Sequence, residues 1–368
     1  MKATQQLHDA GQSLWLDNIT RGILNDGTLA RYIRDLSVTG LTSNPTIFDH
    51  AITSGDFYDE AIRQKSADGQ QGEPLFFELA IEDLQRAADL FRPVHDRTSG
   101  VDGWVSLEVS PLLANDTAGT AAAAANLHGR ADRPNLFIKI PGTAEGLPAI
   151  EESIANGVPV NVTLLFSASQ YVAAADAYMR GIERRVAAGL DPTVGSVASL
   201  FVSRWDVAVK DKVPKALHNR LGIAVAQRTY REYRRVLASP RWAALAAAGA
   251  RPQRLLFAST STKDPHAADT LYVEALAAPD TVNTIPDKTL TAFADHGQVN
   301  ELLSSDGGDA ESVLAEFRQA GIDDAALAAQ LQREGAESFD KSWTDLLRQL
   351  AAKQEALAPK AHATAGNS

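Results

Sequence analysis

The stretch Asn135-Leu136-Phe137-Ile138-Lys139-Ile140-Pro141-Gly142-Thr143 is a short apolar run that holds one lysine and ends in a proline and a glycine. Its length and its branched and aromatic residues predict a buried β-strand. An amine in that setting loses hydration and is expected to shift toward its neutral, nucleophilic form. Lys139 is therefore a candidate for a Schiff-base lysine. The plainer interpretation is a lysine at a strand end that extends its head into water, which is the commoner case.

Seven further runs of this kind lie before and after this stretch, separated by long segments with helical periodicity. The eight runs span 13–17, 37–41, 104–109, 136–140, 158–165, 197–202, 255–259 and 282–285. Between them, Phe77, Ile81 and Leu84 recur at helical spacing, and 167–179, 230–245 and 325–350 are also helical by pattern. Alternating strands and helices predict a parallel sheet covered by helices, and eight repeats favour a closed (β/α)8 barrel of the α/β class.

The alternative fold is an open doubly wound sheet, which usually carries a glycine-rich phosphate loop. Neither G-x-G-x-x-G nor G-x-x-x-x-G-K-[ST] occurs in the chain. We therefore expect one barrel domain over 1–350 with additional helices and a C-terminal helix. The segment 351–368 loses apolar periodicity and is expected to be a frayed tail, and 280–308 is expected to hold the eighth strand and a long polar loop.

Composition narrows the classes of function. The chain has 368 residues, 45% of them hydrophobic, which is enough for a large core, and it has neither a long apolar run nor the apolar stretch of a signal peptide at its start. We therefore expect a cytoplasmic protein that does not enter a membrane. Zero cysteines exclude disulfides, thiolate catalysis and cysteine-type metal sites, and the eight histidines show no ligand pairing, so no metal or other cofactor is expected.

Charge bears on the partners. A net charge of −11 argues against nucleic acid, while an anionic small molecule would need local Arg, Lys or backbone donors. The sequence makes no prediction of the oligomeric state.

Polar residues lie at or near the carboxyl ends of the predicted strands, where barrel enzymes carry their chemistry. They are Asp17, Asn44, Glu108, Lys139, Asn161, Thr163, Ser199, Arg204, Ser259, Ser261 and Lys263. Each has a simpler explanation when taken alone. Asp17 could cap a helix, Asn44-Pro45 is a common turn, and buried polar residues of parallel strands can form satisfied networks. Their coincidence at successive strand ends favours a catalytic site.

These residue types support one particular chemistry. A neutral Lys139 can attack a ketone to give a carbinolamine and then an iminium, which is an electron sink beside the bond to be broken. Glu108 could act as the general acid/base for this step, with a water held by Thr163, and Asp17 could take the proton from a hydroxyl two carbons away.

The remaining polar residues would bind the substrate. Asn44 and Asn161 would orient hydroxyl groups, and Asn161 and Thr163 share one face of their strand because side chains alternate. Arg204 would hold a phosphate, together with Ser259 and with Ser261 or Lys263.

At these positions the sequence closely resembles the transaldolases, specifically their longer bacterial form. Residues 40–48, G-L-T-S-N-P-T-I-F, match the family's T-[ST]-N-P signature, and 137–146, F-I-K-I-P-G-T-A-E-G, match the signature around its Schiff-base lysine. Residues 161–166, N-V-T-L-L-F, resemble the family's N-[LV]-T-L-[LI]-F strand. The resemblance runs from about Leu14 to Asp287 with all three motifs in order, which makes it specific.

The resemblance implies a class I aldolase-type barrel with its lysine on the fourth strand. The implied activity moves a dihydroxyacetone unit from sedoheptulose 7-phosphate to glyceraldehyde 3-phosphate, giving erythrose 4-phosphate and fructose 6-phosphate, a step of the non-oxidative pentose phosphate pathway. It implies that no metal or organic cofactor is needed. By the same match, site roles pass to Asp17, Asn44, Glu108, Lys139, Asn161, Thr163, Ser199 and Arg204.

The chain departs from the family around the phosphate. Many members carry an Arg after the seventh strand, where this chain has 258–264, A-S-T-S-T-K-D, so Lys263 or the serine hydroxyls are the candidate substitutes. Residues 199–204, S-L-F-V-S-R, differ from the commoner S-P-F-V-G-R. Two rival hypotheses remain: a simple aldolase of the same fold that releases free dihydroxyacetone, and a catalytically silent barrel used as a binding scaffold.

Overall fold

The computed structural model describes residues 1–358, and its central element is a closed barrel of parallel strands. Neighbouring strands in the barrel are consecutive in the chain, and the last strand pairs with the first. The strands are β1 (Gln12–Asp17), β2 (Val38–Thr42), β3 (Val105–Glu108), β4 (Leu136–Pro141), β5 (Val160–Leu165), β6 (Ser196–Phe201), β7 (Arg254–Ala258) and β8 (Thr281–Ile285). The (β/α)8 prediction is confirmed, and the open-sheet alternative is wrong.

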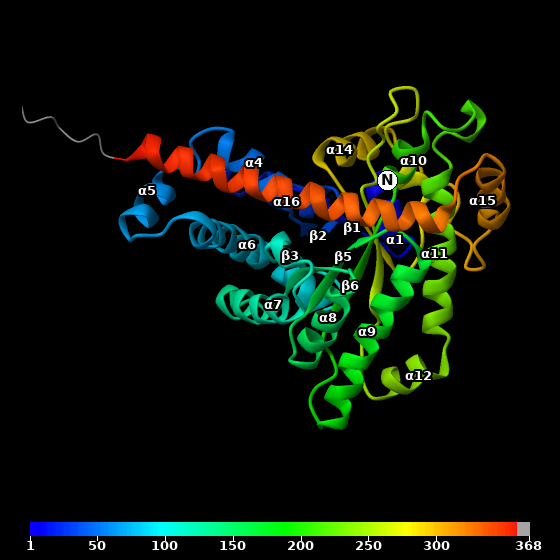
Figure 1. Ribbon diagram of the computed structural model, residues 1–368, viewed down its shortest axis with the longest axis horizontal. Coiled ribbons are helices and arrows are strands. Elements are labelled where there is room, and N and C mark those ends of the chain that lie inside the picture. The colour runs from blue at the N-terminus through cyan, green and yellow to red at the C-terminus, as the bar shows by residue number, and fades with distance from the viewer. Residues whose placement is uncertain (359–368) are drawn as a thin grey trace, which may run out of the picture.

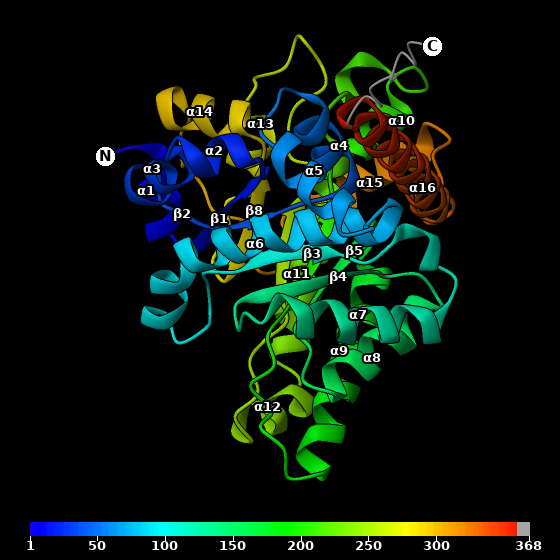
Figure 2. The ribbon, with the colours of Figure 1, turned by 90° about the vertical axis from the view of Figure 1, so that its left-hand side faces the viewer.

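Helices surround this barrel and cover its outer face (Figures 1 and 2). They are α1 (Ala3–Asp9), α2 (Arg21–Asn25), α3 (Thr28–Asp35), α4 (Pro45–Thr53), α5 (Asp59–Ala67), α6 (Gly72–Arg97), α7 (Thr117–Ala131), α8 (Gly146–Ala155), α9 (Ala168–Ala187), α10 (Ser203–Val209), α11 (Leu221–Leu237), α12 (Pro240–Ala247), α13 (Leu271–Ala275), α14 (Asp287–His296), α15 (Ala310–Gln319) and α16 (Asp324–Leu357). Within the described residues, no helix is long and apolar enough to cross a membrane.

Two helix predictions need correction. The helix expected over 230–245 is broken, since α11 ends at Leu237 and α12 begins at Pro240. A proline lacks the N–H that a helix interior requires but fits a first turn, and Ser239 accepts a hydrogen bond from the Trp242 N–H as the cap of the new helix. The loop expected within 280–308 contains α14 after β8. Its buried Leu290 and Phe293, three residues apart, were the available signal.

The C-terminal boundary also differs from the expectation. The helix expected over 325–350 continues to Leu357, so 351–357 are helical and the frayed tail predicted from 351 is wrong for that part. Polar contacts explain the extension, because Lys353 Nζ donates to the Ile52 carbonyl at 2.8 Å and Gln354 Nε2 donates to the Gln70 carbonyl at 3.0 Å. The remainder of the predicted tail, 359–368, lies outside the described residues.

Aromatic rings fill the barrel toward the amino ends of its strands. Trp104 stacks on Phe137 with ring centroids 4.0 Å apart, and Trp15 lies 6.1 Å from Phe137. Gly40 makes room for them, since a Cβ there would lie 2.7 Å from both the Trp104 carbonyl oxygen and the Trp15 ring. This end of the barrel is a packed core, so a ligand can enter only at the carboxyl ends.

The long helix α16 lies over those carboxyl ends (Figure 1). It packs against α4, α5, α6 and β5, elements that lie far from it in the sequence. From its middle, Gln332 Nε2 donates to the carbonyl oxygens of Gly142 and Leu164, each at 3.0 Å. Gly142 follows β4 and Leu164 lies within β5, so α16 is joined directly to the carboxyl ends of two barrel strands.

Candidate active site

A cavity of about 250 Å³ opens at the carboxyl ends of the strands, beneath α16. It is lined by Asp17, Thr42, Asn44, Thr46, Ile47, His50, Lys139, Thr163, Ser199, Phe201, Arg204, Ala258, Ser259, Ser261, Lys263, Thr284, Pro286 and Phe339. A larger cavity of about 440 Å³ lies beside α11, but the guanidinium in its wall, that of Arg228, is already paired with two carboxylates. The smaller cavity therefore holds the candidate site.

Lys139 is the buried amine of this cavity. Only 5% of the residue is exposed, and Nζ donates a hydrogen bond to the Ser43 carbonyl oxygen at 3.0 Å. It also lies 3.2 Å from Glu108 Oε2, because Glu108 and Lys139 are partners in the register of β3 and β4. The burial expected from the sequence is correct. The surroundings are not wholly apolar, however, since the amine has a carboxylate and a carbonyl beside it.

Glu108 lies behind Lys139 and does not line the cavity. Both carboxylate oxygens are buried, and neither has a hydrogen bond of good geometry within the described chain, so the contact with Lys139 is an ion pair. Burial raises the pKa of Glu108 above its ordinary value, and the charge of Lys139 offsets part of that rise. Glu108 is thus the acidic group nearest to the Lys139 amine, and its raised pKa favours its protonated form more than in water.

Asp17, the last residue of β1, is a second acidic group of the site. Thr42 Oγ1 donates to Asp17 Oδ1 at 2.8 Å and lies 2.7 Å from Thr284 Oγ1. Burial raises the pKa of Asp17, while Lys139 and the Thr42 hydrogen bond oppose that rise. Asp17 faces the cavity and could take a proton from a bound hydroxyl.

The two predicted polar residues of β5 behave differently. Thr163 lines the cavity, and its buried Oγ1 has no hydrogen-bond partner among the described residues. Asn161 does not line the cavity: its Nδ2 donates to Ser106 Oγ at 3.1 Å and its Oδ1 accepts from Ser199 Oγ at 2.7 Å. We predicted direct contact of Asn161 with the substrate, but the structure places it in a satisfied network whose member Ser199 reaches the cavity.

Asn44 serves two purposes at the start of α4. Its Oδ1 accepts the Ile47 N–H at 3.0 Å, which caps the helix in the position before Pro45. Its amide nitrogen makes no hydrogen bond within 1–358 and lies on the cavity wall, so it can still donate to a ligand.

Arg204 and Lys263 supply positive charge to the cavity. Arg204 makes no ion pair with the described residues and lies over Phe201, with its guanidinium carbon 5.3 Å from the ring centroid. Burial lowers the pKa of Arg204 from its ordinary value, and Glu334 opposes this effect. The exposed Lys263 donates to Ser261 Oγ at 2.9 Å. Arg204 and Lys263 therefore line the same cavity from two different parts of the chain, where both could contact one anion.

The seventh-strand loop brings its serines into this space. Ser259 Oγ lies 2.9 Å from Ser203 Oγ, and Ser259 has φ +56°, a left-handed conformation that is uncommon for a non-glycine residue. Ser261 lines the same cavity. The predicted phosphate-site residues Arg204, Ser259, Ser261 and Lys263 thus all line one cavity.

Several cavity residues were missed by sequence reasoning. Thr42 ends β2 within the T-S-N-P motif, and Thr284 is the next-to-last residue of β8, so their positions gave a usable signal. His50 follows the T-S-N-P motif by one helical turn and was overlooked. Phe339 could not have been found, because nothing in the sequence indicates that α16 crosses the barrel. In the described part of the chain, no cluster of three or more His, Cys, Asp or Glu side chains is arranged to hold a metal ion.

A buried lysine beside a buried carboxylate, at the carboxyl ends of barrel strands, defines the class of lysine-dependent barrel enzymes that attack carbonyl carbons. The family model described as Transaldolase/Fructose-6-phosphate aldolase matches residues 14–350. The chain belongs to this family.

Curated relatives cover nearly the whole chain. A transaldolase of Parafrankia sp. (strain EAN1pec) is 47% identical over 355 residues, which are 94% of this chain and 96% of the relative. A transaldolase of Thermobifida fusca (strain YX) is 46% identical over 356 residues, 94% of this chain and 97% of the relative. A transaldolase of Thiobacillus denitrificans is 44% identical over 358 residues, 95% of this chain and 100% of the relative.

Proposed function

We propose that the protein is a transaldolase of the cytoplasm that moves a dihydroxyacetone unit from sedoheptulose 7-phosphate to glyceraldehyde 3-phosphate. The products are erythrose 4-phosphate and fructose 6-phosphate, as in the non-oxidative pentose phosphate pathway. The observation that carries the proposal is that Lys139 lies 3.2 Å from the buried carboxylate of Glu108. Lys139 stands in the motif 137–146, which resembles the family's signature around its imine-forming lysine. The names of relatives at 44–47% identity support it.

In the first step, Lys139 Nζ passes a proton to Glu108 and attacks the donor's ketone carbon. The carbinolamine then loses its hydroxyl as water with a proton returned from Glu108, which leaves an iminium on Nζ. The unpartnered Thr163 Oγ1 is placed to hold that water. A carboxyl whose pKa is raised by burial suits this role because it can both receive and return the proton.

In the second step, Asp17 takes the proton of the hydroxyl two carbons from the iminium. The bond between the hydroxyl-bearing carbon and the carbon next to the iminium then breaks, and its electrons neutralise the iminium. An aldehyde leaves, while a three-carbon enamine stays on Lys139. Attack of the enamine on the acceptor aldehyde reverses these steps and returns the proton from Asp17. The charge of Lys139, which opposes the rise in the pKa of Asp17, couples the two groups.

The phosphate of donor and acceptor is held by Arg204, with Ser259, Ser261 and Lys263 on the facing loop. Asn44 donates to a substrate hydroxyl. Asn161 acts as a positioning residue that orients Ser199, with which it shares a 2.7 Å hydrogen bond. Because the lysine-bound iminium is itself the electron sink, this chemistry needs neither a metal ion nor an organic cofactor.

The test is borohydride trapping with fructose 6-phosphate, read by mass spectrometry, together with a coupled assay with and without an acceptor aldehyde. We expect an adduct on the peptide that holds Lys139 and rapid turnover only when the acceptor is present. Cleavage at full speed without an acceptor would instead identify a simple aldolase. The absence of any adduct would leave the binding-scaffold hypothesis.

A further inference from the structure

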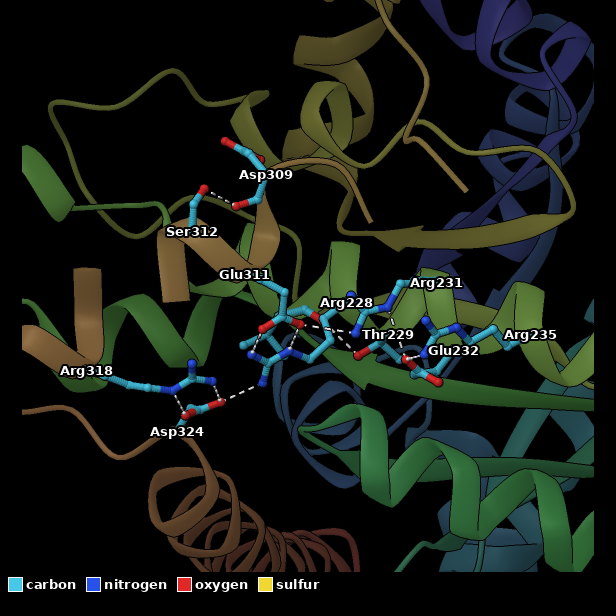
Figure 3. Close-up of polar contacts among 11 residues, drawn as sticks. Arg228, Thr229, Arg231, Glu232, Arg235, Asp309, Glu311, Ser312, Arg318 and Asp324 are labelled. Carbon is cyan, nitrogen blue, oxygen red and sulfur yellow. Dashed lines mark hydrogen bonds and ion pairs between the residues drawn. The ribbon is translucent and has the colours of Figure 1, made fainter. Parts of the chain in front are cut away.

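The helix α16 is held at its beginning by a network of charged side chains (Figure 3). Arg228 of α11 pairs with Asp324 at 2.6 Å and with Glu311 of α15 at 2.7 Å, and Arg318 pairs with Asp324 at 3.0 Å. Asp324 is the first residue of α16. The start of this helix is therefore bound to two helices that surround the barrel.

The far end of α16 is fixed in a similar way. Lys353 Nζ lies 2.8 Å from Asp59 Oδ1 and donates to the carbonyl oxygens of Ile52 and Gly55 at 2.8 and 2.6 Å. Near the middle, Gln332 binds two carbonyls on the rim, as described above. These contacts anchor α16 across the cavity at both ends and near its middle.

Gly335 lets α16 lie close to β5 and to Arg204. A Cβ at Gly335 would lie 3.0 Å from Leu164 Cδ2, which is a tight approach, and 3.4 Å from Arg204 Nη1, which is ordinary contact. Leu164 itself has φ +60° in β5, where the pairing with β6 shifts its register. The strand and the helix are thus shaped to each other at this point.

Phe339 follows Gly335 by one turn and faces Lys139. Its ring centroid is 6.0 Å from Lys139 Nζ, it lines the cavity, and only 6% of it is exposed. The ring is an apolar surface of the cavity close to the nitrogen that would carry the substrate. The contacts of α16 with the surrounding helices and with β5 hold the ring in this position.

We propose that Phe339 is a specificity-determining residue that keeps water away from the lysine-bound enamine, so that the three-carbon unit passes to an aldehyde. This inference rests on the proposed transaldolase function. Loss of the unit to water requires the enamine carbon to gain a proton, which restores the iminium. One water then adds to the iminium carbon, and dihydroxyacetone leaves as Nζ regains its amine. That water balances the one released when the imine formed, so the net reaction is cleavage of fructose 6-phosphate into dihydroxyacetone and glyceraldehyde 3-phosphate.

The experiment measures a ratio of two rates in one enzyme: cleavage of fructose 6-phosphate without an acceptor, divided by transfer to erythrose 4-phosphate. In Phe339→Ala the ratio should rise by roughly tenfold or more, because the variant opens to water the space that the ring fills beside Lys139 Nζ. Phe339→Leu keeps an apolar cover and should stay near the wild-type ratio. Phe339→Val, a smaller truncation with an intermediate ratio, replaces Phe339→Ala if that variant does not fold.

Leu346→Ala is the matched control, because Leu346 is a fully buried residue of the same helix that lies outside the cavity lining. It should lower the stability of the fold without changing the cavity wall, and so leave the ratio unchanged. An equal rise in Leu346→Ala, or an unchanged ratio in Phe339→Ala or Phe339→Val, overturns the assignment of Phe339. Failure of the wild-type enzyme to form a borohydride adduct or to transfer overturns the proposed function instead, so the two failures are distinguishable.

Discussion

The barrel contains two buried polar clusters, one at each end of its strands, and they differ in how well they are satisfied. At the amino end, Asp102 accepts hydrogen bonds from Ser13 Oγ, from Trp15 Nε1 at 2.8 Å and from the Gly103 N–H at 3.0 Å. Arg254 donates to Ser13 Oγ and to the Thr281 carbonyl, each at 2.7 Å. Every charged group in this cluster has partners.

At the carboxyl end, Asp17 and Lys139 have hydrogen-bond partners, but two other buried residues do not. Both oxygens of Glu108 and the hydroxyl of Thr163 have no hydrogen bond within the described chain, although each residue is at most 5% exposed. Leaving a buried polar group unsatisfied costs about 1–3 kcal/mol. The cluster of Asp102 and Arg254 thus helps to hold the amino ends of the strands together, whereas at the cavity end Thr163 Oγ1 is left free for a ligand, at a cost in stability.

The largest effect should come from Lys139→Arg at the unsatisfied end. A guanidinium stays protonated and cannot form an imine, so borohydride trapping should vanish and transfer should fall by at least about 10⁴-fold. Trapping and coupled-assay rates check this. Lys288→Arg, an exposed lysine on α14, is the control and should behave as wild type. An adduct in Lys139→Arg would place the imine on another lysine.

The next largest effect should come from Asp17→Ala. Loss of the base for carbon–carbon cleavage should slow transfer by about 10²–10⁴-fold, while the imine still forms and can be trapped. Comparing the yield of the trapped adduct with the transfer rate separates the two steps. If both decline together, Asp17 acts in imine formation and its assignment is wrong.

The substitution Glu108→Gln should lower the transfer rate and, at higher pH, raise the stability of the fold. Transfer should fall by about 10²–10⁴-fold because proton transfer to and from Lys139 is lost. Since burial raises the pKa of folded Glu108, its proton stabilises the fold fully below its ordinary value of 4.5, and this stabilisation is lost as the pH rises through the folded pKa. Glutamine is always neutral. Urea unfolding should therefore show the variant gaining stability relative to wild type as the pH rises above 4.5, and a constant difference would contradict this.

Asp102→Asn tests the satisfied end. The amide cannot accept all the hydrogen bonds that the carboxylate accepts, so unfolding in urea should require about 1–3 kcal/mol less. The transfer rate per folded molecule should change by less than about twofold, because the amino ends of the strands lie away from the cavity. A loss of activity comparable to that of Glu108→Gln would end the distinction between the two clusters.

The smallest effect should come from Lys263→Met at the cavity mouth. An exposed cation contributes about 0.2–1 kcal/mol, so KM for the phosphorylated donor should rise by roughly two- to fivefold with little change in kcat. The rise should shrink as salt increases, because exposed charges are screened. Donor KM at low and high salt measures this. A fall in kcat equal to the rise in KM would show that Lys263 acts in the chemistry.

Sequence reasoning located what is local. Each strand run lies on an observed strand, since short apolar runs between helical periods carry a clear signal, and polar residues at strand ends gather by the geometry of any parallel barrel. It could not tell that Asn161 is satisfied by Ser106, because that hydrogen bond crosses from β5 to β3. Nor could it show that Phe339 lies over Lys139, because periodicity reveals which face of a helix is apolar and not what that face covers.

The position of α16 has a consequence for how the site is made. All eight strands are complete by Ile285, yet the residue that faces Lys139 from above comes from position 339. During synthesis, the strands that carry Lys139, Asp17 and Glu108 and the loop after β7 thus all precede α16, the helix that covers the cavity. Completion of the barrel and completion of the active site are separate events in the synthesis of this protein, and the second waits for its last long helix.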